Sequence, residues 1–298
     1  MLNVKKVGLF ISLTFAFNWL MATLFFVWVG KEKATALLVM MVAYMFGPMI
    51  MAIVVQKFIY KETIKEPLGV SFRLNGWFLV AWLLPPLLAL ATFGVSLLLP
   101  GVEYAPDMAG MFERFEAALT PEQLAQMQAQ AAALPVHPIW LSLAQGLIAG
   151  ITINAVAAFG EELGWRGFLQ LELGGLGFWK SAALIGLIWG IWHAPLILQG
   201  HNYPEHPVAG VGLMTLWCLL LAPIFSYIRL KARSVIAAAV LHGTLNATYG
   251  LSIMLVKGGS DLTVGLTGLA GFVVLAFVNL GLFSYERLLT KEALKPGA

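Results

Sequence analysis

The feature that most constrains this chain is a series of apolar runs, each 18 or more residues long, that recurs along the whole sequence. Each run is long enough to cross a hydrocarbon core of roughly 30 Å as a helix. The runs are continuous rather than alternating, so helices are expected rather than a closed barrel. Only 11% of the residues are charged, against about a quarter in soluble domains, and a water-facing surface cannot be built from so few. The prediction is an all-α, polytopic integral membrane protein.

Charged residues and Pro/Gly breaks divide the sequence into a bundle of about eight transmembrane helices, within one domain over residues 1–298. The predicted spans are 7–30, 35–58, 76–99, 139–171, 179–199, 208–229, 233–256 and 262–286. The fourth exceeds one crossing, so we expect it to be tilted or to extend beyond the core. Lys5 and Lys6 before the first run imitate a secretory signal, but the run is too long for one, and a retained span is expected.

Lysine and arginine divide unequally between the two predicted faces. With a cytoplasmic N-terminus, that face holds 14 of the 18, and the other holds Lys31, Lys33, Arg114 and Lys257. The positive-inside rule therefore predicts cytoplasmic N- and C-termini, in a plasma (inner) membrane. The basic stretch 60–75 is expected to rest on lipid headgroups. No basic tract or phosphate-binding loop occurs, so we expect membrane lipid but no nucleic acid among the partners.

Residues 101–138 form the one long outer loop. Within it, Thr120, Pro121 and Gln123 have the spacing of a capping box with Pro at the first helical position. A short helix lying on the membrane surface is expected there, as a plain connector in preference to a lid. Cys218, alone in an apolar run, is expected to be a buried and inert thiol.

Glycines spaced four apart occur in the fourth and fifth predicted spans. Small residues at this spacing let helices approach closely inside lipid. The pairs predict close packing of the fourth span against the fifth. They are Gly146 with Gly150, Gly160 with Gly164, and Gly186 with Gly190.

Ionisable side chains in the middle of a span are costly, and here they are confined to residues 161–246. Counted from the predicted cytoplasmic ends of their spans, Glu161, His193 and His242 lie about 15, 21 and 14 Å deep at 1.5 Å per residue. Three spans thus place polar groups at a similar depth. Asn246 follows His242 by one turn, so an imidazole N–H and an amide can point the same way, as an oxyanion site requires. The sequence therefore predicts a polar site inside the bundle.

The adjacent carboxyls of Glu161 and Glu162 project about 100° apart on their helix. Glu162 and Arg166 are four residues apart, which suits a structural ion pair near the cytoplasmic interface and leaves Glu161 free as a general base. Simpler interpretations remain for single residues: either histidine can be a packing residue, Arg166 can extend to the interface, and Asn246 can tie two helices together. Two neighbouring carboxyls are harder to explain without a function.

The motifs Glu161-Glu162-x-x-Trp165-Arg166-Gly167, Trp189-x-x-x-His193 and His242-x-x-x-Asn246 resemble those of the CPBP family, also called the Abi or CAAX-protease family. That family includes the type II CAAX prenyl endopeptidases. The motifs occur in family order, within a motif core that we place at residues 139–256. The family often has Phe where Trp189 stands, and the exchange keeps an aromatic wall.

The resemblance implies an intramembrane endopeptidase of the glutamic type, acting on membrane-associated peptides or proteins, with prenylated CAAX tails as one candidate substrate class. Glu161 would activate water with help from His193, and His242 and Asn246 would stabilise the oxyanion. Glu162 and Arg166 would support them. The resemblance also implies a conical bundle of eight helices whose cavity opens toward the cytoplasm.

Two other interpretations stay open. In the first, Glu161, His193 and His242 bind zinc in a metalloprotease, although the HExxH helix of zincins is absent and Asn246 then has no task. No metal and no other cofactor is the favoured expectation. In the second, the chain is a transporter or a non-catalytic bacteriocin-immunity protein. No role is assigned to the outer-loop residues His137, His201 and His206.

Overall fold

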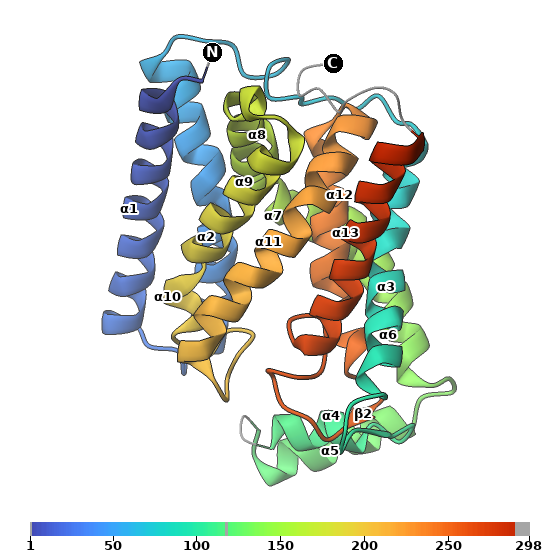
Figure 1. The fold of residues 1–298 in the computed structure, drawn as a ribbon. Coiled ribbons are helices and arrows are strands. Elements are labelled where there is room, and N and C mark those ends of the chain that lie inside the picture. Colours follow the sequence, from blue (N-terminus) through green and yellow to red (C-terminus); the bar gives the residue numbers. More distant parts are fainter. Residues whose placement is uncertain (1, 117–118, 290–298) are drawn as a thin grey trace.

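The structure is a computed structural model that describes residues 2–116 and 119–289. These residues form a bundle of helices that run roughly along one axis (Figure 1). The long helices are α1 (Val4–Trp28), α2 (Ala34–Ile53), which continues into the π-helix η1 (Val54–Ile59), α3 (Gly76–Ser96), α11 (Pro207–Ala232) and α13 (Leu269–Leu289). The helices that carry the sequence motifs are α6 (Pro138–Ile151), α7 (Ile153–Glu162), the π-helix η2 (Leu163–Leu169), α8 (Gln170–Glu172), α9 (Phe178–Trp192), α10 (Ala194–Ile197) and α12 (Val235–Thr248).

Short elements complete the described chain. They are the helices α4 (Ala109–Phe115) and α5 (Pro121–Ala132), the 3-10 turns η3 (Gly174–Leu176) and η4 (Tyr249–Ser252), and the strands β1 (Glu103–Tyr104) and β2 (Val256–Lys257). The two strands pair antiparallel and join the outer loop to the segment before α13. In α5, Thr120 accepts from the backbone of Gln123, and the Gln123 side chain accepts from the backbone of Thr120. The capping box predicted from the sequence is therefore confirmed.

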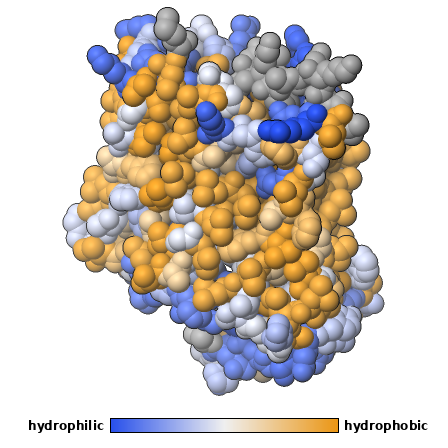
Figure 2. All heavy atoms as spheres, in the orientation of Figure 1, coloured by the Kyte–Doolittle hydropathy of each residue, from blue (hydrophilic) through white to orange (hydrophobic). Residues whose placement is uncertain are grey.

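The predicted fold class is confirmed, because every predicted span coincides with a helix in the described part of the chain. Among the described residues, five helices are long and apolar enough to cross a membrane, and a bent pair gives a sixth span if it counts as one crossing. α9 is apolar but shorter, and α12 has 14 residues. The expected number of about eight is therefore approximate. Figure 2 shows apolar side chains over the middle of the visible face and polar ones toward its ends, as an integral membrane protein requires.

The over-long fourth span is bent rather than simply tilted. α6 and the helix that follows it meet at Thr152 with a bend of 50°. The Thr152 hydroxyl donates to the carbonyl of Ile148 at 2.7 Å, a back-bond that bends helices. After the bend, α7 carries Glu161 and Glu162 directly into η2. π-Helical turns are rare and concentrate at functional sites.

The glycine pairs pack closely, but against helices other than the predicted one. A Cβ on Gly150 would lie 2.6 Å from the Thr244 Cα of α12, and one on Gly160 would lie 2.7 Å from the Met45 carbonyl oxygen of α2. A Cβ on Gly190 would lie 2.4 Å from the Thr215 Cα of α11. The prediction that the fourth span packs on the fifth through these pairs is wrong. Spacing identified the close contacts, but only tertiary structure selects their partners.

The two ends of the bundle differ. α1 begins and α13 ends at the same end, called here the terminal end, where segment 60–75 also lies (Figure 1). α4 and α5 cover the opposite end, called here the α5 end. This arrangement agrees with the even number of crossings predicted from the sequence.

Candidate active site

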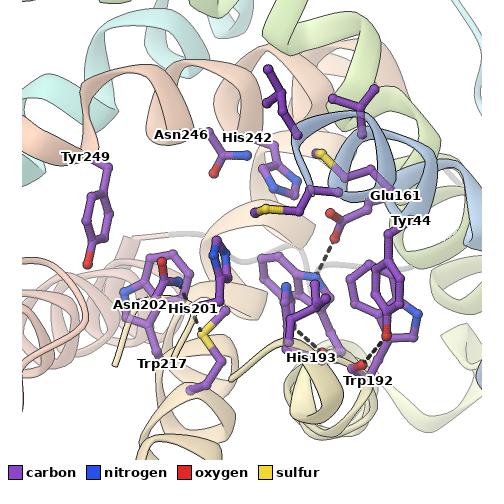
Figure 3. Close-up of a pocket in the computed structure, with 17 residues that line it drawn as sticks. Tyr44, Glu161, Trp192, His193, His201, Asn202, Trp217, His242, Asn246 and Tyr249 are labelled. Carbon is purple, nitrogen blue, oxygen red and sulfur yellow. Dashed lines mark hydrogen bonds between the residues drawn. The ribbon is translucent and has the colours of Figure 1, made fainter. Parts of the chain in front are cut away.

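The mid-span polar residues converge on one cavity. Glu161 from α7, His193 directly after α9, and His242 and Asn246 from α12 line a cavity of about 400 Å³ (Figure 3). The exposed fractions are 3% for Glu161, 8% for His193 and 5% for His242. Asn246 is exposed, and its amide also lines the cavity. The structure therefore brings together all four residues that the sequence motifs singled out.

Two indoles hold one oxygen of Glu161. The Nε1 of Trp189 donates to Glu161 Oε2 at 2.7 Å, and the Nε1 of Trp165 donates to the same oxygen at 3.4 Å. Oε1 makes no hydrogen bond to any residue in the described ranges. The carboxylate is therefore oriented through one oxygen, while the other is free to accept a proton.

Glu162 has two partners, Arg166 and His242. Arg166 Nη1 donates to both of its oxygens, at 3.0 and 3.2 Å, so the predicted ion pair is present. The pair is fully buried and Arg166 lies within η2, so Arg166 is not an exposed loop charge. The Arg166 guanidinium stacks 4.4 Å from the Trp189 ring and 4.5 Å from that of Phe225, and both contacts favour a buried cation.

Glu162 also fixes the orientation of His242. The Nδ1 of His242 lies 2.8 Å from Glu162 Oε1, and a carboxylate accepts, so Nδ1 carries the proton. The nitrogen left over is Nε2. It can donate to an oxyanion only when the ring carries a second proton, because in the neutral ring Nε2 is an acceptor. The sequence predicted two aligned donors at His242 and Asn246, and the structure makes the imidazole donor conditional on protonation.

His193 sits at the break between α9 and α10, so its side chain leaves the helix end rather than a helix face. Its Nδ1 lies 2.8 Å from the carbonyl oxygen of Trp189 and therefore donates to it. This bond leaves Nε2 as an acceptor, the form that suits the removal of a proton from water. The Trp192 ring packs 4.8 Å from the imidazole and limits its rotation.

Hydrogen bonds from three aromatic residues at the site were not predicted from the sequence. Trp165 and Trp189 orient Glu161, and Tyr44 of α2 lines the cavity and donates to the carbonyl of Trp192 at 2.8 Å. The spacing of Glu161 and Trp165, four residues apart, could have indicated the first of these contacts. The other two join residues far apart in the sequence, and no local pattern indicates them.

The donor set does not fit a shared metal ion in this arrangement. Both imidazoles donate Nδ1–H to an oxygen, as metal-ligating histidines usually do. However, across the described residues, one group of three has ligand atoms within 4.8 Å of one another, and it is Glu205 with His206 and Asp261 in the outer loops. Glu161, His193 and His242 are not such a group. Zinc ligands lie about 2.0–2.3 Å from the ion and so must meet more closely.

The direction in which the cavity extends bears on two expectations, the cytoplasmic opening that the family resemblance implied and the cytoplasmic termini predicted from Lys and Arg. Its lining continues from Glu161 to His201 and Asn202 after α10 and to Leu38 near the start of α2, all toward the α5 end. Leu38 is 63% exposed. The cavity therefore opens away from the termini. A cytoplasmic opening and cytoplasmic termini cannot both hold.

Comparison with known proteins identifies the same part of the chain. Residues 138–248 match the sequence profile of the family described as "Type II CAAX prenyl endopeptidase Rce1-like". The chain is also 31% identical over 103 residues to "CAAX prenyl protease 2" of the archaeon Methanococcus maripaludis. That alignment covers 32% of this chain and 38% of the archaeal protein. Both matches confirm the resemblance seen in the motifs, and the matched segment contains every candidate catalytic residue. Residues 138–248, the segment that builds the site, are thus similar in sequence to the Rce1-like type II CAAX prenyl endopeptidases.

Proposed function

We propose that the chain is an intramembrane endopeptidase that hydrolyses peptide bonds of membrane-associated substrates. The observation that carries the proposal is the Glu161 carboxylate, oriented through one oxygen and free at the other, inside a cavity that His193, His242 and Asn246 also line. Similarity of residues 138–248 to a family of endopeptidases supports this assignment.

Glu161 acts as the general base. Its free oxygen takes a proton from water, whose oxygen attacks the carbonyl carbon of the scissile bond. His193 assists, because its Nε2 is an acceptor that holds the same water. The proton then passes from Glu161 to the leaving nitrogen as the C–N bond breaks, which gives a carboxyl and an amine product.

His242 and Asn246 stabilise the oxygen anion of the tetrahedral intermediate. The Asn246 amide donates directly, and His242 donates from Nε2 as an imidazolium. Glu162 and Arg166 touch no reacting atom in this scheme. Glu162 holds His242 by its Nδ1–H, and Arg166 compensates the charge of Glu162. No step requires a metal ion.

The decisive experiment compares wild-type protein with Glu161→Gln. When both are purified in detergent, the wild type is expected to cleave membrane peptides and the variant is expected not to. Both are expected to insert into the membrane and to purify as folded bundles. Quantitative proteomics of membranes that carry either form then identifies substrates by new terminal peptides. Peptides ending in a prenylated CAAX tail, the class that the names of the relatives indicate, form the first test set. Near wild-type turnover in the variant would exclude Glu161 as the base.

Two rival functions give different results. A zinc protease loses activity on chelation and contains one metal per chain. A non-catalytic immunity or transport protein leaves the terminal peptides unchanged between the wild type and Glu161→Gln.

A further inference from the structure

The cavity continues beyond the four candidate catalytic residues into a loop with no assigned role. Residues 198–206 connect α10 to α11, and two polar side chains of this loop, His201 and Asn202, line the same cavity as Glu161 (Figure 3). The sequence suggested no function for either. The cavity wall beside them is otherwise apolar, so these two polar side chains are candidates for contacting a bound molecule.

The opposite side of the site is closed by packing. Trp165, Phe168 and Phe10 are fully buried, and the Phe10 ring lies 5.9 Å from that of Trp165 and 4.5 Å from that of Phe168. Above them Lys6, 2% exposed, pairs with Glu62 and Glu172 at 2.6 Å each. A polypeptide cannot pass this layer without unpacking it, whereas the cavity lining continues toward the α5 end through His201 and Asn202.

The loop is firmly held, while its two polar side chains have spare hydrogen-bonding capacity. Tyr203 is fully buried and donates to the carbonyl of Thr267 at 2.7 Å, and the His201 backbone N–H donates to Leu196. In the described chain the His201 ring makes no hydrogen bond, and Asn202 makes only a 4.0 Å contact to the sulfur of Met214. Both residues are partly exposed, so their polar groups can contact a bound ligand.

Asn202 has a φ of 62°, in the left-handed region that asparagine adopts more readily than most residues other than glycine. Its amide lies at the cavity. The walls beside it are apolar and adaptable, formed by Met41, Met45, Met214 and Trp217. Methionine surfaces accept varied apolar side chains.

We propose that loop 198–206 is the substrate entrance, where His201 and Asn202 bind the main chain of an extended, apolar peptide segment that arrives from the membrane face opposite the termini. Amide and imidazole groups complement peptide N–H and C=O groups, and the methionine-rich wall takes the side chains. The inference rests on the proposed function for its kinetics but not for its binding test.

The binding test removes catalysis first. In a Glu161→Gln background, a photoreactive residue at position 202 is expected to crosslink an apolar peptide that ends in a prenylated CAAX tail. The same residue at position 205, where Glu205 is exposed on the same loop and does not line the cavity, serves as the matched control. Equal crosslinking at both positions, or no crosslinking at position 202, would refute the proposal that loop 198–206 is the substrate entrance.

The kinetic test uses His201→Ala and Asn202→Gly, since glycine tolerates the positive φ of Asn202. Each is expected to raise KM roughly 3- to 10-fold with little change in kcat, as the loss of one net hydrogen bond predicts. Glu205→Gln is expected to leave both constants unchanged, and His201→Gln to restore part of the KM. If Glu161→Gln abolishes turnover while the loop variants behave as wild type, the proposed entrance is wrong and the proposed function is supported. If position 202 crosslinks the peptide but the wild type does not cleave it, the entrance stands and the proposed function fails.

Discussion

The two adjacent glutamates of α7 are expected to respond in opposite ways to the same substitution. Glu162 is fully buried, accepts two hydrogen bonds from Arg166 and one from His242, and supplies the negative charge beside a buried guanidinium. In Glu162→Gln that charge is lost and Arg166 stays buried without compensation. Breaking a buried pair in this way costs about 3–5 kcal/mol. Within the described residues, Glu161 has indole partners only and no ion pair, so Glu161→Gln is expected to change stability by less than about 1 kcal/mol.

Equilibrium unfolding in detergent micelles measures the stability of both variants, and peptide cleavage measures their activity. Glu161→Gln is expected to be stable and inactive. Glu162→Gln is expected to unfold at markedly lower denaturant and to keep partial activity where it stays folded, because it positions His242 rather than touching substrate. If Glu161→Gln were the less stable of the two, or if Glu162→Gln unfolded like the wild type, the assignment of a catalytic role to Glu161 and a structural role to Glu162 would be refuted.

Three more outcomes are expected. Trp189→Phe lowers kcat/KM at least 10-fold, because a 2.7 Å hydrogen bond to a charged group contributes about 1.5–3 kcal/mol; steady-state kinetics that show less than a twofold loss would contradict this. His242→Ala and Asn246→Ala are each expected to lower kcat about 10²–10³-fold, and the activity of the wild type is expected to survive chelation. If elemental analysis instead finds stoichiometric zinc that is lost in His242→Ala but kept in Asn246→Ala, the result would argue for a metalloprotease. With cytoplasmic termini, a cysteine that replaces Asn202 is expected to react with an impermeant thiol reagent added outside intact cells. A cysteine that replaces the exposed Gly175, at the terminal end, is expected not to react. The reverse pattern would place the termini outside the cell.

Much of the fold was predictable because lipid imposes simple rules. The length of each apolar run sets each helix, and the cost of burying charge explains why Glu161, His193 and His242 mark an internal site. The i, i+4 spacing likewise gave the ion pair of Glu162 with Arg166, which the structure contains.

The remaining features depend on contacts that local patterns do not encode. The contact between Trp189 of α9 and Glu161 of α7 joins residues far apart in the sequence, so from the sequence Trp189 was expected only to form an aromatic wall. The Nδ1–H of His242 is not available to an oxyanion because it donates to Glu162, 80 residues away in the sequence. Glycine spacing could not choose among helices, and the bend at Thr152 depends on one hydroxyl. The direction of the cavity follows from the packing of Phe10 on Trp165 and Phe168, which pairs the first helix with the fourth predicted span.

The closed aromatic layer formed by Phe10, Trp165 and Phe168 also constrains the order of events in catalysis. If loop 198–206 is the entrance proposed above, water and peptide enter by the same route, and a bound peptide obstructs it. We therefore expect the water that Glu161 would activate to be in place before the peptide arrives. The cleaved fragment on the entrance side must leave before the next water and the next substrate can enter. That fragment is expected to be a competitive inhibitor with respect to substrate. The rate of each catalytic cycle is expected to be limited by exchange of product for water and substrate at the entrance, since nothing passes through the closed side of the bundle.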